Sequence, residues 1–158
     1  MPNFTIRFAK AADCTLILDF IRQLAVYEQL AHQVVATEED LRDSLFVKQQ
    51  AEVILAFEDD TAVGFALFFH NYSTFLGKAG LYLEDLFVSE AYRGRGYGRA
   101  LFARLAKIAL ERNCERLDWW CLDWNRNAMD FYARLGAVPM SDWTVCRLDA
   151  PAMKKLAE

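Results

Sequence analysis

Hydrophobic and polar residues follow the periods of strands and helices along most of the chain. Alternating or short apolar runs predict β-strands, and they span residues 4–8, 52–57, 62–69, 81–88, 116–121, 138–143 and 145–148. Apolar residues at helical spacing predict helices over residues 11–29, 99–110 and 125–135, and an S/T-x-x-[DE] cap at residues 37–40 predicts a further short helix. Residues 71–80 are predicted to be a loop, and residues 151–156 a tail. Antiparallel strands early in the chain, followed by a β–α–β crossover, indicate an α/β fold with a mixed sheet and helices on both faces.

A glycine-rich turn connects the predicted strand 81–88 to the predicted helix 99–110. Gly94, Gly96 and Gly98 leave backbone N–H groups uncovered by side chains, and the helix that follows directs the positive end of its dipole at the turn. Such a turn is suited to binding a pyrophosphate or a similar anion. A plain strand-to-helix connection is the alternative interpretation.

Two common phosphate-binding motifs do not fit this turn. A Walker A loop has Lys and then Ser or Thr after its last glycine, whereas Arg99 and Ala100 follow Gly98. The dinucleotide motif G-x-G-x-x-G fails because its third glycine would fall on Arg99 or on Leu101. The pattern that remains is R-x-x-G-x-G over residues 93–98.

Length and composition predict one globular domain covering residues 1–158. The chain is 54% hydrophobic and 25% charged, and its net charge of −4 gives no support to a nucleic-acid partner. We expect no targeting segment, no segment that crosses a membrane, and no metal site, because neither cysteines nor histidines have ligand spacing. The scattered cysteines are expected to be buried and reduced, as in a cytosolic protein; they are Cys14, Cys114, Cys121 and Cys146.

A second motif follows the predicted helix 99–110: residues 125–137 have the form N-x-x-A-x-x-F-Y-x-x-x-G-A. Together with R-x-x-G-x-G, it resembles the GNAT acetyltransferase superfamily, and the resemblance covers nearly the whole chain. More narrowly, the chain resembles the diamine and thialysine acetyltransferase branch at residues 11–14, 27–28, 76–78, 82–88, 92–94 and 124–132. The resemblance implies a mostly antiparallel central sheet and a homodimer, which the cysteine pattern would place in the cytoplasm. It also implies direct transfer of an acetyl group from acetyl-CoA to a small primary amine in a ternary complex, without a metal.

The same resemblance implies which residues bind acetyl-CoA. Backbone N–H groups of Leu86 and Val88 would polarise the thioester carbonyl, the loop from Arg93 to Arg99 would hold the pyrophosphate, and the second motif would contact the CoA arm. The implied set is Leu86, Phe87, Val88, Arg93, Gly94, Arg95, Gly96, Tyr97, Gly98, Arg99, Asn125, Asn127, Ala128, Tyr132 and Arg134.

Glu84 and Tyr132 are the implied catalytic pair. On a regular strand, Glu84 shares one face with Tyr82 and Leu86. Asp85 then points the other way. The amine has a pKa of about 10 and glutamate one of about 4.3, so Glu84 is expected to hold the ammonium group and accept its proton by relay. Tyr132 is expected to hydrogen-bond the departing thiolate, because full proton transfer to it is uphill by about 2 kcal/mol. The alternatives are a surface acid for Glu84 and an apolar helix stripe for Tyr132.

The branch resemblance also implies an amine-binding set, namely Tyr27, Glu28, Glu84, Asp118, Trp119 and Trp120. Adjacent strand residues face opposite sides, so at most one of the two tryptophans faces the amine. For residues 27–28, a solvated helix end is the alternative. Polyamine-acetylating relatives carry an acid and a tryptophan where this chain has Ser73 and Phe75. Thialysine, a lysine-like amino acid or a short diamine is therefore expected ahead of spermidine or spermine.

The sequence leaves two alternative functions open. A non-catalytic acyl-CoA-binding domain would keep the glycine-rich turn and lose the acid–base pair, and both Glu84 and Tyr132 are present. A protein or peptide N-terminal acetyltransferase would need an open groove for its substrate.

Overall fold

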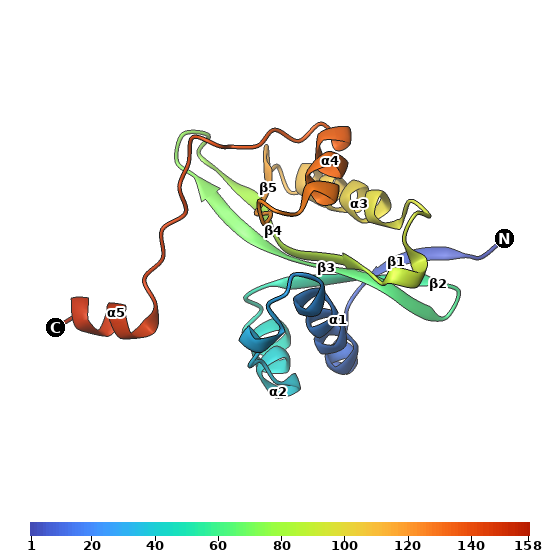
Figure 1. The fold of residues 1–158 in the computed structure, drawn as a ribbon, viewed down its shortest axis with the longest axis horizontal. Coiled ribbons are helices and arrows are strands. Elements are labelled where there is room, and N and C mark those ends of the chain that lie inside the picture. Colours follow the sequence, from blue (N-terminus) through green and yellow to red (C-terminus); the bar gives the residue numbers. More distant parts are fainter. The chain divides into compact units, whose positions relative to one another are not determined.

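The protein is described here by a computed structural model that covers residues 1–158. It divides into two compact units, Met1–Leu122 and Asp123–Glu158. The first unit contains a five-stranded sheet in the order β1-β2-β3-β4-β5 (Figure 1). Strands β1 to β4 pair antiparallel and β5 pairs parallel with β4, which confirms the predicted mixed, mostly antiparallel sheet. The strands are β1 (Phe4–Phe8), β2 (Glu52–Glu58), β3 (Thr61–Ser73), β4 (Lys78–Val88) and β5 (Leu117–Trp119).

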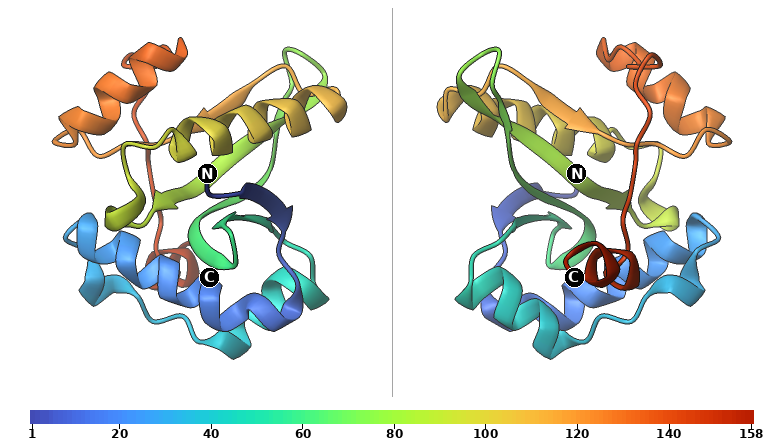
Figure 2. Two further views of the ribbon diagram at one scale, coloured as in Figure 1. Left: turned by 90° about the vertical axis from the view of Figure 1, so that its right-hand side faces the viewer. Right: turned by 90° about the vertical axis from the view of Figure 1, so that its left-hand side faces the viewer.

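Helices cover both faces of this sheet, as predicted (Figure 1, Figure 2). On one face, α1 directs Ile17 and Phe20 into the core, where Phe20 stacks on Phe65 of β3 with ring centroids 5.5 Å apart. On the other face, Leu101 and Leu105 of α3 are fully buried. Burying one such side chain contributes roughly 1.5–3 kcal/mol, so the two layers fix the helices on the sheet. The helices of this unit are α1 (Cys14–Tyr27), α2 (Glu38–Leu41) and α3 (Tyr97–Glu111).

Short helical turns flank these elements. Thr37 caps α2 in a reciprocal pair with Asp40, whose N–H donates to Thr37 Oγ1 at 3.1 Å while Thr37 N–H donates to Asp40 Oδ2 at 2.9 Å. This is the capping box that the sequence predicts. Helix α2 continues into a π-helical turn, Arg42–Val47, and three 3₁₀ turns lie at Ala11–Asp13, Ala31–Gln33 and Glu90–Tyr92.

A β-bulge interrupts β4 at Glu84. Leu83 pairs with Phe68 and Asp85 pairs with Leu67, so Glu84 has no partner across the β3–β4 ladder. A bulge adds one residue to one strand and bends it. The side chains before and after Glu84 therefore do not continue a simple alternation.

The bulge overturns the predicted orientation of Asp85. Paired residues of neighbouring strands lie on the same face, so Asp85 lies with Leu67, which packs against the core on the α1 side. Tyr82 pairs with Phe69, two residues beyond Leu67, and therefore lies on this face as well. The expectation that Asp85 points away from Tyr82 is wrong, because regular alternation ends at the bulge. The expectation that Leu86 shares a face with Tyr82 is wrong for the same reason, since Leu86 pairs with Ala66.

The β3–β4 hairpin is longer than predicted. Ser73 pairs with Lys78, so only residues 74–77 form the turn, and the expected loop over 71–80 is mostly strand. Gly77 adopts a φ of 66°, which a glycine allows at little cost. In contrast, β5 is shorter than predicted and ends at Trp119.

The second unit is built around α4 (Arg126–Leu135), which begins and ends as predicted. The Asn125 side chain accepts from Ala128 N–H at 3.3 Å, and Gly136 ends the helix with a φ of 93°. The strands predicted over 138–143 and 145–148 are wrong, because a strand needs a hydrogen-bonded neighbour and these residues pair with none. The predicted tail forms a short helix instead, α5 (Ala150–Leu156), capped by Asp149.

Cys14, Cys114 and Cys146 form no disulfide, and only part of the prediction that the cysteines are buried is correct. Cys14 and Cys114 are buried, whereas Cys121 is partly buried and Cys146 is exposed. Cys146 lies in the segment whose predicted strands are not formed, which explains its exposure. Separately, none of the helices combines the length and apolar character needed to span a membrane.

Candidate active site

The glycine-rich loop leads from β4 into the N-terminus of α3. Gly94 and Gly96 adopt φ values of 77° and 82°, a left-handed conformation that residues with a Cβ rarely adopt. Gly96 is the N-cap of α3, and no side chain caps this helix. A Cβ added at either glycine would meet nothing within 4 Å. The first-turn N–H groups of α3 are therefore reachable, and an anion could bind there.

The three arginines of this region have different contacts. Arg93 donates from Nε to the carbonyl of Val88 at 2.9 Å, and its guanidinium lies over the rings of Tyr27 and Phe87 at 5.0 and 5.1 Å. Arg93 thus fastens the loop to β4 and to the end of α1. Arg95 is bonded to a carboxylate of β2, whereas Arg99 in the first turn of α3 is exposed and forms no ion pair. Arg99 is therefore the loop arginine whose side chain has neither an ion pair nor a hydrogen bond, so its charge is available to a ligand.

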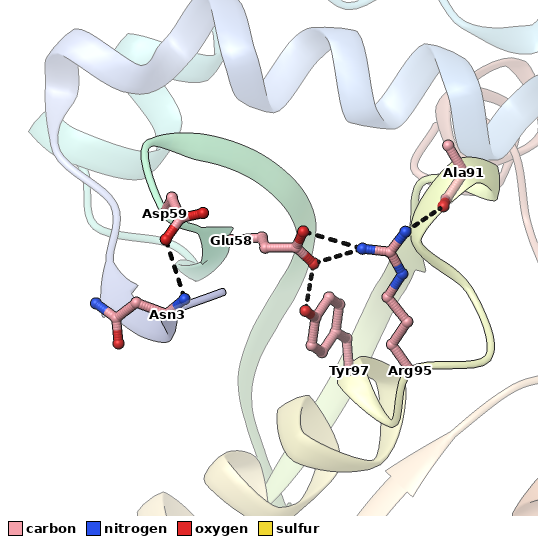
Figure 3. Close-up of polar contacts among 6 residues, drawn as sticks. All are labelled: Asn3, Glu58, Asp59, Ala91, Arg95 and Tyr97. Carbon is pink, nitrogen blue, oxygen red and sulfur yellow. Dashed lines mark hydrogen bonds and ion pairs between the residues drawn. The ribbon is translucent and has the colours of Figure 1, made fainter. Parts of the chain in front are cut away.

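The carboxylate that holds Arg95 belongs to Glu58 (Figure 3). Arg95 Nη1 donates to both Glu58 oxygens at 2.9 and 2.8 Å, and the hydroxyl of Tyr97 donates to Glu58 Oε2. Tyr97 is buried and stacks on Phe4 with ring centroids 4.2 Å apart. The hydrogen bond from Tyr97 and the pairing with Arg95 hold the pKa of Glu58 below its usual value. The residue pattern indicates no role for Glu58, because its partners lie 37 and 39 residues away along the chain.

The central strand has an open edge beside this loop. Strand β5 pairs with β4 only through residues 81–83, whereas Leu86, Phe87 and Val88 pair with β3 alone. Alternate N–H and C=O groups of residues 84–88 therefore point to an edge that has no partner strand. Phe87 and Val88 are buried and Leu86 is partly buried. This edge is where backbone donors to a thioester carbonyl are predicted.

Three carboxylates gather near the bulge, and we call Glu28, Glu84 and Asp85 the carboxylate cluster. Glu28 is the C-cap of α1 and is partly buried, Asp85 is partly buried on the same face of the sheet, and Glu84 is exposed at the bulge. Burial, followed by the charges of Glu84 and Glu28, raises the pKa of Asp85 to about 7. Burial and Glu84 also raise the pKa of Glu28.

The cluster extends to Tyr82 and β5. Burial, followed by the charges of Glu84, Asp118 and Asp85, raises the pKa of Tyr82 to about 12, so its hydroxyl stays protonated. Asp118 pairs with Tyr82 across the β4–β5 ladder and accepts from Asn71 Nδ2 at 3.5 Å. These negative charges suit a cationic ligand. The residue pattern does not indicate a role for Asp85, because it gives no sign of the bulge.

The two tryptophans lie among different neighbours. Trp119 packs against Phe102 of α3, with ring centroids 4.9 Å apart. Trp120 meets the ring of Tyr82 edge-on at 6.1 Å and is largely exposed. Because Trp119 contacts the α3 side, Trp120 is the tryptophan that accompanies Tyr82 and Asp118.

The remaining predicted residues belong to α4 in the second unit. The ring of Tyr132 lies 5.8 Å from that of Phe131, and its carbonyl accepts from Ala137 N–H at 3.0 Å. Asn127 and Arg134 are exposed on this helix, with Arg134 lying 6.0 Å from the Phe131 ring. Tyr132 therefore belongs to one unit, and Glu84 with the glycine-rich loop belongs to the other.

Comparison with known proteins gives a consistent picture. The sequence profile described as the acetyltransferase (GNAT) family matches residues 16–137. The chain is 39% identical to a thialysine N-epsilon-acetyltransferase from Bos taurus, with 99% of each chain covered. It is 31% identical to an L-ornithine N5-acetyltransferase from Arabidopsis thaliana, over 96% of this chain and 86% of that one. Among solved structures, an integron cassette protein from the mobile metagenome of V. cholerae has a TM-score of 0.81 and 31% identity, with 98% of each chain covered.

Proposed function

The chain belongs to the acetyltransferase (GNAT) family, and on that premise we propose that it acetylates a small amino acid or short diamine. The acetyl group moves from acetyl-CoA to a primary amine of thialysine, a lysine-like amino acid or a diamine, by direct attack in a ternary complex. Relatives that act on thialysine and on ornithine support this substrate class. The observation that carries the proposal is the carboxylate cluster beside the open edge of β4, because it can bind an amine as its cation.

The glycine-rich loop fits the diphosphate of acetyl-CoA. Its first-turn N–H groups are uncapped, its two left-handed glycines leave open space, and the charge of Arg99 is unpaired. The bound co-substrate supplies the acetyl group as a thioester. Backbone donors among residues 86–88 are proposed to polarise the thioester carbonyl from the open edge of β4. Proposed further contacts of the CoA arm, all from the second unit, are Asn125, Asn127, Ala128, Tyr132 and Arg134.

The carboxylate cluster is proposed to bind the amine and take its proton. Glu84 is exposed at the bulge and is the proposed base, acting directly or through water. Asp85 has a pKa raised to about 7, so it can exchange a proton near neutral pH. It is proposed to accept the amine proton together with Glu84. Tyr27, Glu28, Asp118, Trp119 and Trp120 complete the proposed amine site. Trp120 is favoured over Trp119 as the amine contact because it lies against Tyr82.

Tyr132 is proposed to hydrogen-bond the departing thiolate. A phenol with a pKa of about 10 remains protonated at neutral pH and can donate to the sulfur as negative charge develops. The test is Tyr132→Phe, which keeps the ring and removes only the hydroxyl. We expect kcat to fall at least about tenfold while CoA binds with nearly unchanged affinity. Equal kcat in the two proteins would remove Tyr132 from the mechanism.

The substrate class is tested by acetyl-CoA turnover, followed as thiol release, with a panel of amines. The panel holds thialysine, lysine, ornithine, short diamines, spermidine, spermine and a lysine-containing peptide. We expect the highest kcat/KM with the amino acids or the short diamines. Higher kcat/KM with spermidine would favour a polyamine acetyltransferase, and higher kcat/KM with the peptide a protein acetyltransferase. CoA binding without turnover of any amine would mean a non-catalytic acyl-CoA-binding domain.

The two units are proposed to act as one domain, within a cytoplasmic homodimer. Relatives align over 99% of the chain, which supports a single functional domain. The thiols of Cys14, Cys114 and Cys146, which form no disulfide, fit a reducing compartment. Residues 138–148 carry exposed apolar side chains at the predicted strand positions, with Trp143 77% exposed, and a second copy is the proposed strand partner. Sedimentation of the wild type as a dimer and of Trp143→Glu as a monomer is the expected result. A wild-type monomer would refute this assembly.

A further inference from the structure

Glu58 lies at the end of β2, and its side chain contacts the glycine-rich loop from outside the family motifs (Figure 3). We propose that Glu58 is a positioning residue for acetyl-CoA: it holds the loop in its diphosphate-binding conformation through Arg95 and Tyr97. We call these three residues the Glu58 brace. The inference rests on the proposed function, because it assumes that this loop binds the diphosphate.

The brace acts on both sides of Gly96, the N-cap of α3. Arg95 directly precedes Gly96 and Tyr97 directly follows it, and both donate hydrogen bonds to the same carboxylate. Gly96 has a φ of 82°, and glycine loses more conformational freedom on ordering than any other residue. Charge-assisted hydrogen bonds from both residues to one fixed carboxylate therefore order the loop before a ligand arrives.

The carboxylate itself is fixed by the sheet. Glu58 pairs with Phe4 of β1 and with Thr61 of β3. The next residue, Asp59, exchanges two hydrogen bonds with Asn3, at 3.0 Å from Asn3 N–H to Asp59 Oδ1 and at 2.7 Å from Asp59 N–H to the Asn3 carbonyl. The Glu58 side chain is 14% exposed against 46% for Arg95. The rigid partner is therefore Glu58, and the loop is the part that it positions.

Tyr97 connects the brace to the core. Its ring is buried and stacks on Phe4 with an interplanar angle of 7°, while its hydroxyl reaches Glu58. Arg95 has further contacts, with Nη2 3.5 Å from the Ala91 carbonyl and its guanidinium 5.1 Å from the Tyr92 ring. The guanidinium of Arg95 is therefore already engaged by groups of the protein itself. Arg95 then contributes to diphosphate binding by its backbone position, and Arg99 by its charge.

For the effect of removing Glu58 on CoA affinity, the brace predicts the opposite of what simple electrostatics predicts. Removing a carboxylate near an anion site should strengthen anion binding if only charge matters. If Glu58 positions the loop, its removal should weaken binding instead. Glu90 offers a matched control, because it is exposed, precedes the same loop and forms no side-chain hydrogen bond or ion pair.

The experiment compares Glu58→Gln, Arg95→Gln, their double variant and Glu90→Gln in the full chain. CoA affinity is measured by calorimetry, and acetyl-CoA KM, amine KM and kcat are measured with thialysine. For Glu58→Gln we expect CoA affinity and acetyl-CoA KM to worsen about tenfold, with kcat and amine KM within about twofold of wild type. Arg95→Gln should weaken CoA binding to a similar extent, and the double variant no further than either single change. Glu90→Gln should bind CoA as wild type does.

Several results would overturn the brace. CoA binding by Glu58→Gln that is unchanged or tighter, or additive losses in the double variant, would mean that Glu58 does not act through Arg95. A uniform loss of kcat and amine affinity would mean general destabilisation. If Glu58→Gln does not fold, Tyr97→Phe keeps the stacked ring, removes one bond of the brace and should weaken CoA binding without lowering kcat. Failure of the wild type to bind CoA would overturn the proposed function itself, whereas normal wild-type binding with an unaffected Glu58→Gln would overturn only the brace.

Discussion

Asp85 is expected to destabilise the folded protein at neutral and alkaline pH. Its pKa rises from an ordinary value of 3.8 to about 7 because the carboxyl is buried beside Glu84 and Glu28. Below pH 3.8 the group is protonated in the folded and unfolded chains, so it has no effect on stability. Between these two values the unfolded chain binds fewer protons than the folded one, and stability falls as the pH rises. Above about pH 7 both states are ionised and the full cost applies.

The free-energy cost of ionising Asp85 in the folded protein follows from its pKa shift. A displacement of about three pKa units, at 1.36 kcal/mol per unit, gives about 4 kcal/mol. Asp85→Asn has nearly the same shape and remains neutral at every pH. The variant should match wild type near pH 4 and exceed it at pH 8 by up to about 4 kcal/mol. Glu28 keeps a raised pKa in the variant, because burial and Glu84 cause it, so a smaller pH dependence remains.

The assay is urea unfolding of both proteins at several pH values from about 4 to 8.5, followed by tryptophan fluorescence. Asp60→Asn is the control, because Asp60 is an exposed carboxylate in the β2–β3 turn and its loss should leave the pH profile unchanged. Parallel profiles for wild type and Asp85→Asn would refute the reasoning. A variant less stable than wild type at pH 8 would also refute it, since the ionised carboxylate would then be stabilised by its surroundings.

Further predictions concern the loop, the sheet and a helix cap. Arg99→Gln should weaken CoA binding about tenfold and flatten its salt dependence in calorimetry, because it removes the unpaired charge of the loop; unchanged affinity would exclude Arg99 as a phosphate contact. Gly64→Ala should lower the free energy of unfolding by roughly 1–3 kcal/mol, because its Cβ would lie 2.7 Å from the Phe87 carbonyl oxygen, and unaltered thermal unfolding would contradict this. Thr37→Ala should cost about 1 kcal/mol in urea unfolding by removing the cap on Asp40 N–H, whereas Thr37→Ser should restore most of it.

The sequence reveals those parts of the site that depend on local conformation. The glycine-rich loop, the Asn125 cap and the end of α4 at Gly136 follow from residue types and spacing, because neighbouring residues determine these structures. The orientation of Asp85 does not, since a bulge depends on how β3 and β4 pair. The pairing of Glu58 with Arg95 spans 37 residues and leaves no periodic signal.

The incorrectly predicted strands have a different cause. Residues 138–148 have the alternating pattern of strands, yet such a pattern indicates only that one face of the segment is apolar enough to be buried. Whether such a segment becomes a strand depends on a partner edge. This chain's sheet pairs only β1 to β5, so the pattern is present without the pairing. Propensity and pairing are thus separate requirements, and the sequence reports only the first.

The strand order of the sheet has a consequence for how the chain folds. Strands β1 to β5 are neighbours in space in the same order as along the chain; β2–β3 and β3–β4 are joined by short turns, whereas helical segments separate β1 from β2 and β4 from β5. During synthesis, β1 to β4 can pair before α3 leaves the ribosome. We therefore expect the turn that carries Glu58 to be in place when Arg95 and Tyr97 emerge, and the glycine-rich loop to fold onto a surface that already exists.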